Sequence, residues 1–155
     1  MATGHMLTNR GRLLHAQGLW ADAAAGAVKV GFVKVQGAAA DTQAEIDDMN
    51  TVTDLLVTAG CTECDFTNYV RTALTRSAAA EDDTNHRVNM DASDVVIASA
   101  GGATNNTILG AFYYDATTDT NDTTRLLISV DWFATGFPTN GGQYTYAITD
   151  AYRLS

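Results

Sequence analysis

Three stretches in the last third of the chain have the spacing of apolar residues that predicts β-strands: residues 107–114, 125–133 and 143–149. Successive side chains of a strand point to opposite faces, so apolar and polar residues alternate when only one face is buried. The second and third stretches alternate in this way, whereas the first is apolar on both faces and is typical of a central or doubly covered strand. We expect the three to form an antiparallel meander. The predicted core faces carry Leu126, Ile128, Val130 and Trp132 in the second strand, and Tyr144, Tyr146 and Ile148 in the third.

Further strands are predicted upstream, at residues 28–35, 69–75, 87–91 and 95–98, with an exposed loop over residues 77–85. Turn residues separate them at the spacing of about 8 to 12 residues that is typical of a sandwich or barrel. Helices do not alternate with the strands of the second half, which argues against a parallel, doubly wound sheet. The predicted fold is mainly β: one antiparallel β-sandwich domain over residues 7–155, jelly-roll or immunoglobulin-like, with about seven strands and two short helices.

The N-terminal region is predicted to hold an arm and a helix. Residues 1–6 have a second Met behind a Gly-His pair, and we expect them to be an expression scar or flexible arm outside the fold. Thr8 or Asn9 can cap a short helix that ends at Gly18. Its apolar side would carry Leu13, Leu14 and Leu19, and its exposed side Arg10 and Arg12. The two arginines form either a solvated helix face or a contact with an acidic neighbour.

The second predicted helix has the clearer start and end. Thr42 and Glu45 fit a capping box, in which each side chain accepts a hydrogen bond from a backbone N–H group of the other residue. Apolar residues follow at helical spacing up to Leu56, and Gly60 stands where a left-handed helix stop belongs. We therefore expect one continuous helix between Thr42 and Gly60.

The net negative charge of the chain disfavours partners that are themselves negatively charged. The chain has 155 residues, with 9 basic and 18 acidic side chains, a formal net charge of −9 and a sequence pI near 4.4. Such a domain repels phosphate backbones and anionic lipids, so neither nucleic acid nor a membrane is an expected partner. No apolar stretch reaches the roughly 18 residues of a membrane helix, and no secretory signal is recognisable.

Two groups of residues are candidate ligands for metals. Cys61 and Cys64 form a Cys-x-x-Cys pair without a second ligand pair, so a local disulfide or two free thiols are the preferred interpretations. The acidic loop with Asp115, Asp119 and Asp122 offers the oxygen ligands that Ca²⁺ prefers, but it lacks the Gly and distal Glu of a Ca²⁺-binding loop. A solvated hairpin tip is the alternative. We expect no metal and no cofactor.

No set of catalytic residues emerges from the sequence. It has no Gly-x-Ser-x-Gly elbow and no glycine-rich phosphate loop. Asp131 beside Trp132 could belong to a sugar site, but an Asp on the wet face of a strand is the simpler interpretation. Tyr113, Phe133 and Phe137 lie off the predicted core face, where they either contact another subunit or are covered by the N-terminal helix. We expect no enzyme activity.

Several ordered segments resemble a known group of proteins. They are residues 7–14 (LTNRGRLL), 28–34, 48–56 (DMNTVTDLL), 65–75 (DFTNYVRTALT) and 87–95 (RVNMDASDV), followed by the aromatic C-terminal strands. In this order they are similar to the small β-rich structural proteins of tailed bacteriophage virions, of the head-decoration or tail-associated type. The resemblance includes no chemical motif, so it carries over no functional residues. The Cys61-x-x-Cys64 pair departs from the pattern.

The resemblance implies a non-enzymatic virion protein: a repeated, homo-oligomeric subunit that decorates or stabilises the capsid or tail surface. Its partners would be other virion proteins, and its place the virion after synthesis in the host cytoplasm. Arg10, Arg12, Tyr113, Phe133 and Phe137 are the candidate docking residues. The alternative is a carbohydrate-binding or adhesin-like module, in which exposed rings stack on sugars and the acidic loop holds Ca²⁺.

Overall fold

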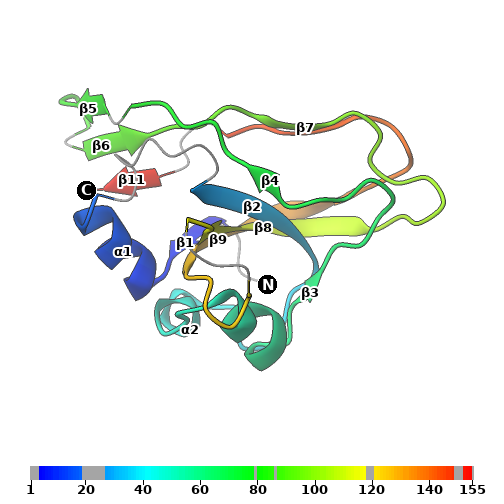
Figure 1. Cartoon of the computed structure of the whole chain (residues 1–155), viewed down its shortest axis with the longest axis horizontal. Helices are drawn as coiled ribbons and strands as arrows, with labels where there is room; N and C mark the ends of the chain where they lie inside the picture. Colours follow the sequence, from blue (N-terminus) through cyan, green and yellow to red (C-terminus); the bar gives the residue numbers. More distant parts are fainter. Residues whose placement is uncertain are drawn as a thin grey trace.

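The computed structural model describes residues 4–18, 27–78, 80–85, 87–117, 121–148 and 152–154. This part of the chain is mainly β, with antiparallel sheets and short helices, as predicted. The middle sheet has six strands. Figure 1 shows the helical segments of residues 43–58 on one side of it and the smaller sheets on the other. One hydrophobic cluster packs on each face of the middle sheet: Tyr113 belongs to the cluster shared with the smaller sheets, and Phe112 to the cluster shared with the helices.

The middle sheet is built around the strand that is apolar on both faces. This strand, β8, pairs with β9 on one side and with β2 on the other, so the prediction of a central strand is confirmed. β1 is the edge strand beside β9, and both β3 and β4 pair with the far side of β2. The strand bounds are β1 Gly4–Leu7, β2 Val28–Val35, β3 Thr62–Glu63, β4 Thr72–Ala73, β8 Thr107–Asp115 and β9 Leu127–Pro138.

The smaller sheets correct two predictions. β10 (Tyr144–Tyr146) pairs with β7 (Val95–Ile97) and not with β9, so the predicted three-stranded meander is wrong at its last strand. The edge of β9 is taken by β1 instead. The expected loop 77–85 contains strand β5 (Ala80–Asp82), which pairs with β6 (Arg87–Met90), and β11 (Tyr152–Leu154) completes that sheet.

The N-terminal residues are part of the fold, contrary to expectation. His5 pairs with Asp131 and Met6 with Val130 in the register of β1 and β9. The Gly-His pair does not look like a strand in the sequence because β1 is an edge strand in which residues Gly4 and His5 are exposed. Residues 4–6 are therefore a structural element and not an arm outside the domain.

β9 is buried more completely than its alternation predicts. Residues Leu127 to Val130 are all buried, because helices cover one face of the sheet and smaller sheets the other. Tyr113 stands opposite Ser129 and Tyr114 opposite Leu127, which leaves Ile128 as an extra residue in a β-bulge. The bulge shifts the alternation by one residue. Leu127 joins Val130 in the cluster on the helical side, and Ile128 faces the other cluster.

The first helix, α1 (Asn9–Ala16), is capped as predicted by Thr8. Its hydroxyl accepts a hydrogen bond from the Gly11 N–H at 2.7 Å and donates one to the Leu127 carbonyl at 2.8 Å. Leu14 is buried, while Leu13 is 44% exposed. Gly11 allows the close approach to β9, because a Cβ atom there would lie 2.2 Å from the Ile128 carbonyl oxygen. Leu19, predicted on the same face, lies outside the described residues.

The second predicted helix is broken into two segments. The capping box of Thr42 and Glu45 is confirmed and starts α2 (Gln43–Asp47). A separate π-helical turn, η2 (Asp54–Thr58), follows. The Asp54 carboxylate accepts hydrogen bonds from the N–H groups of Asn50 and Thr51 at 2.9 and 2.8 Å, which caps the second segment and interrupts the first. The helical spacing of apolar residues continues across the break, so this spacing could not reveal the break.

The predicted stop at Gly60 is confirmed by its φ of +77°. No heavy atom lies within 4 Å of the position that a Cβ atom would take, so a substitution there is strained by its backbone conformation alone. We expect Gly60→Ala to lower the free energy of unfolding by about 1 kcal/mol, and Gly60→Asn by less, because Asn tolerates the left-handed region. Urea unfolding of both variants measures the difference. Equal stability of the Ala variant and the parent would contradict the assignment.

Candidate functional site

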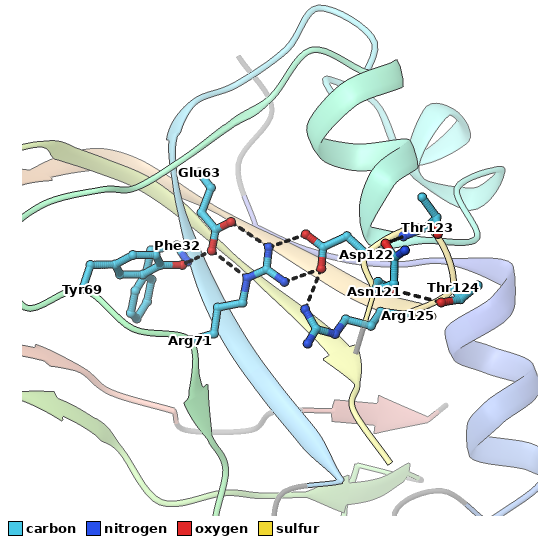
Figure 2. Close-up of polar contacts among 9 residues, drawn as sticks. All are labelled: Phe32, Glu63, Tyr69, Arg71, Asn121, Asp122, Thr123, Thr124 and Arg125. Atoms are coloured by element: carbon cyan, nitrogen blue, oxygen red, sulfur yellow. Dashed lines mark hydrogen bonds and ion pairs between the residues drawn. The ribbon is translucent and has the colours of Figure 1, made fainter. Parts of the chain in front are cut away.

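The most densely connected polar site is a cluster of ion pairs around Arg71, which lies just before β4. Figure 2 shows its guanidinium between the carboxylates of Glu63 in β3 and Asp122 in the loop that follows β8. Arg71 Nε and Nη2 donate to the two Glu63 oxygens, both at 2.7 Å. Nη1 and Nη2 donate to the Asp122 oxygens at 2.6 and 2.7 Å. Both contacts are bidentate, the strongest geometry for an arginine–carboxylate pair.

Two further side chains extend this cluster. Arg125 donates to Asp122 at 2.7 Å, and the Tyr69 hydroxyl donates to Glu63 at 2.5 Å. The same hydroxyl accepts the N–H of Phe32 in β2 at 3.0 Å, which fixes the cluster to the middle sheet. We call Glu63, Tyr69, Arg71, Asp122 and Arg125 the Arg71 clasp. Its two arginines balance its two carboxylates.

The surroundings of the clasp determine its protonation. Hydrogen bonds from Arg71 hold the pKa of Asp122 below its usual range, against the opposing effect of burial. Burial alone would lower the pKa of Arg71, but its hydrogen bonds to Glu63 and Asp122 raise that pKa overall. Burial, and then the neighbouring Glu63 charge, raise the pKa of Tyr69. Arg71 and Asp122 therefore keep their opposite charges at neutral pH, which suits this pair to holding two segments of the chain together.

The clasp packs on aromatic rings of the sheet. The Arg71 guanidinium carbon lies 5.3 Å from the ring centroids of both Phe112 and Tyr114, and that of Arg125 lies 5.3 Å from the Tyr114 ring. Stacked arginines of this kind add cation–π attraction to their ion pairs. The rings also shield one side of the ion pairs from water, which strengthens the attraction between the charges.

Backbone hydrogen bonds connect the clasp to the helical layer. The N–H of Thr53 donates to the Asp122 carbonyl at 3.1 Å, and the N–H of Val52 donates to the Arg125 carbonyl at 3.0 Å. The clasp thus joins three parts of the chain that are distant in sequence: the β3–β4 segment, the loop between β8 and β9, and the start of the second helical segment. Its contacts hold these three segments in fixed positions relative to one another.

Two of the three candidate Ca²⁺ ligands in the acidic loop have other partners in the structure. Asp122 is committed to Arg71 and Arg125, and Asp115 accepts hydrogen bonds from the N–H and hydroxyl groups of Thr117 at 2.9 and 2.5 Å. Asp119 lies outside the described residues. Within the described ranges, no group of three His, Cys, Asp or Glu side chains is placed to hold a metal ion.

The two cysteines are separate buried thiols, so the disulfide alternative is not realised in the structure. Cys61 packs in the cluster on the helical side and Cys64 in the cluster on the other side. The Cys61 sulfur accepts a hydrogen bond from the Gly37 N–H at 3.2 Å. Burial raises the pKa of both thiols, that of Cys64 to about 12, so neither is poised as a thiolate.

The three candidate interface aromatics have different environments. Tyr113 is buried in the core and shares a 2.6 Å hydrogen bond with the Tyr146 hydroxyl, so its assignment to an interface is wrong. Phe133 is half-buried against the Tyr146 ring. Phe137 is 45% exposed, with its ring centroid 4.7 Å from that of Tyr144, and remains a docking candidate.

The structure does not leave Trp132 and Asp131 available for a sugar site. Trp132 is 2% exposed and packs in the core. The neighbouring Asp131 accepts a 2.7 Å hydrogen bond from the Tyr146 hydroxyl. Trp132 therefore offers no surface for stacking on a sugar, and Asp131 serves to satisfy a buried tyrosine.

The two N-terminal arginines are also partly engaged. Arg12 donates to Asp47 of α2 at 2.8 Å and to Asn9 at 2.7 Å, so the acidic neighbour predicted for this basic cluster includes a residue of the same chain. Arg10 is half-buried and not on a fully exposed face.

In the described part of the chain, no helix has the length and hydrophobicity needed to cross a membrane.

Comparison with known proteins adds no further assignment. Neither protein-family models, nor curated proteins, nor solved structures match this chain.

Proposed function

We propose that this chain is a non-enzymatic structural protein of a tailed-bacteriophage virion. It is a repeated, homo-oligomeric subunit that attaches to the capsid or tail surface, and its partners are other virion proteins. We further propose that its middle sheet and smaller sheets form a β-sandwich of the jelly-roll or immunoglobulin-like kind. The order of segments in the sequence suggests this group, and the structure supplies one supporting observation.

That observation is the Arg71 clasp. Its carboxylates and guanidinium groups are all used to lock together the β3–β4 segment, the β8–β9 loop and the helical layer. Such a lock favours one fixed shape, which a subunit repeated on a symmetric surface requires. A catalytic site, by contrast, needs an acid, base or nucleophile directed at a substrate.

The direct test is the composition and assembly of virions. Mass spectrometry of purified particles from lysates that produce this chain should find it at many copies per particle. The isolated protein should be oligomeric by light scattering and should co-sediment with capsids or tails that lack it. A chain that is monomeric and binds neither capsids nor tails would overturn the proposal.

Phe137→Ser tests the remaining docking candidate. The ring is 45% exposed at the end of β9, and aromatic side chains carry much of the energy of protein interfaces. We expect the variant to bind capsids or tails at least tenfold more weakly, with little change in its unfolding midpoint. Val96→Ser in β7, where the side chain is 56% exposed, is the matched control for loss of an exposed apolar group. An equal effect of the two substitutions would contradict a specific role for Phe137.

A further inference from the structure

The break between α2 and η2 creates an apolar pocket that none of the predicted sites includes. Its volume is about 310 Å³, and its lining includes the apolar side chains of Ala39, Met49 and Ala59. Met49 and Ala59 are each 6% exposed, so they form a fixed floor that belongs to the core of the helical layer. The pocket lies at residues 48–50, where a continuous helix was expected.

Carboxylates surround this apolar floor. Glu45, Asp48 and Asp54 belong to the lining, and among the described residues that line the pocket there is no Lys, Arg or His. Asp47 of the same helix is instead paired with Arg12. The negative charge at the pocket is therefore not balanced by a cation in its lining.

Two of these carboxylates are fixed in position and in charge. Glu45 accepts hydrogen bonds from the N–H groups of Asp41 and Thr42 at 2.9 and 2.8 Å, which lower its pKa. Asp54 accepts the N–H groups of Asn50 and Thr51, which lower its pKa despite the opposing effect of burial. Both side chains thus remain ionised well below neutral pH, and their positions do not depend on a ligand.

We propose that this pocket receives a lysine or arginine side chain of a partner protein. The methylene groups of such a side chain match the apolar floor, and its cationic head matches the three carboxylates. The net charge of −9 favours the approach of a basic surface. The inference rests on the proposed function only for the identity of the partner, a neighbouring virion protein.

The test compares two peptides that differ only in the terminal ammonium group of one side chain, acetyl-Gly-Lys-Gly-amide and acetyl-Gly-norleucine-Gly-amide. Chemical shifts of the backbone amides are followed by NMR during titration of the full chain. We expect saturable shifts at Ala39, Met49 and Ala59 with the lysine peptide, and at least threefold weaker binding of the norleucine peptide. Equal binding of both peptides, or no saturable shift at these residues, would overturn the proposal.

Matched variants locate the effect. Asp48→Asn should weaken binding of the lysine peptide two- to fivefold, the range for loss of one exposed charge pair. Glu81→Gln in β5, on the opposite side of the middle sheet, removes the same charge and should leave binding unchanged. Ala39→Leu should reduce binding by filling the pocket. Equal effects of the Asp48 and Glu81 substitutions would show attraction to overall charge alone and overturn the site.

A third ligand distinguishes a partner side chain from a free polyamine. If cadaverine binds more than tenfold tighter than the lysine peptide, the pocket is a small-molecule site and docking of a partner protein is wrong. This experiment uses the isolated chain, whereas the virion test uses particles. If the peptide does not bind but the chain still associates with capsids or tails, the proposed role of the pocket is wrong and the proposed function stands.

Discussion

Arg71→Met is expected to lower the free energy of unfolding by roughly 2–4 kcal/mol. The substitution leaves the carboxylates of Glu63 and Asp122 facing each other without the guanidinium that now lies between them. Their side chains are only 23% and 33% exposed, so water can replace the lost partner only in part. The expected loss of stability is therefore smaller than for removal of one partner of a fully buried ion pair. The loss of stacking on Phe112 and Tyr114 adds to the effect.

Urea unfolding at pH 7 measures this effect, and Arg12→Met is its matched control. Arg12 also pairs with an aspartate at 2.8 Å, but its side chain is 44% exposed, so its removal should change stability by less than about 1 kcal/mol. Adding Glu63→Gln to Arg71→Met should restore part of the loss, because Asp122 keeps Arg125 as its partner and position 63 then carries no unpaired charge. If Arg71→Met and Arg12→Met lowered the free energy of unfolding by the same small amount, the Arg71 clasp would not stabilise the fold.

The clasp also predicts how stability depends on acid. The pKa of Asp122 is lowered in the folded chain, so the stability that its ion pairs provide is present above the ordinary carboxyl pKa of about 4. This contribution is lost as the pH falls through the lowered value. Acid unfolding that originates in the clasp should therefore begin below about pH 4.

Local signals in the sequence located elements well where one short segment determines its own structure. Val28–Val35 has the predicted bounds because alternation and flanking turn residues define it without reference to other segments. The Thr42 capping box and the Gly60 stop are also confirmed, since each depends on a few neighbouring residues. Tyr144, Tyr146 and Ile148 are buried on one side, as their spacing predicts.

Pairing and burial depended on partners that no local pattern specifies. β10 has the alternation of a half-buried strand whether it pairs with β9 or with β7, so its spacing could not show its place. The polar start of β1 concealed an edge strand. The break after α2 depends on a single carboxylate that binds two backbone N–H groups, while the apolar spacing continues across it.

The Arg71 clasp was missed for the same reason. Its central arginine meets a carboxylate 8 residues away and another 51 residues away in the sequence, so no spacing rule connects them. Asp122 did stand out in the sequence, but as a possible ligand of Ca²⁺. One usable signal was present: Arg71 interrupts a stretch with Tyr69, Val70 and Leu74, and a charge among apolar residues needs a partner when it is buried.

Acidification from pH 7 to pH 4.5 is expected to destabilise the chain through His15 on α1. The side chain is 7% exposed, and its burial, with smaller contributions from His5 and Arg76, lowers its pKa from 6.5 to about 4. The unfolded chain takes up a proton near pH 6.5 that the folded chain does not. Stability is therefore full above pH 6.5 and falls as the pH approaches 4, by up to about 3 kcal/mol in total.

Urea unfolding at several pH values between 7 and 4.5 distinguishes His15 from the other titrating groups. His15→Leu keeps an apolar side chain in the buried position and should remove most of the decrease between pH 6.5 and 4.5. His5→Gln in exposed β1 removes one nearby positive charge and should reduce the decrease only slightly. Asp122 of the clasp does not interfere, since its pKa is lowered and its contribution is lost only at lower pH. If His15→Leu and the parent chain lost stability in parallel over this range, α1 would not hold a buried neutral histidine.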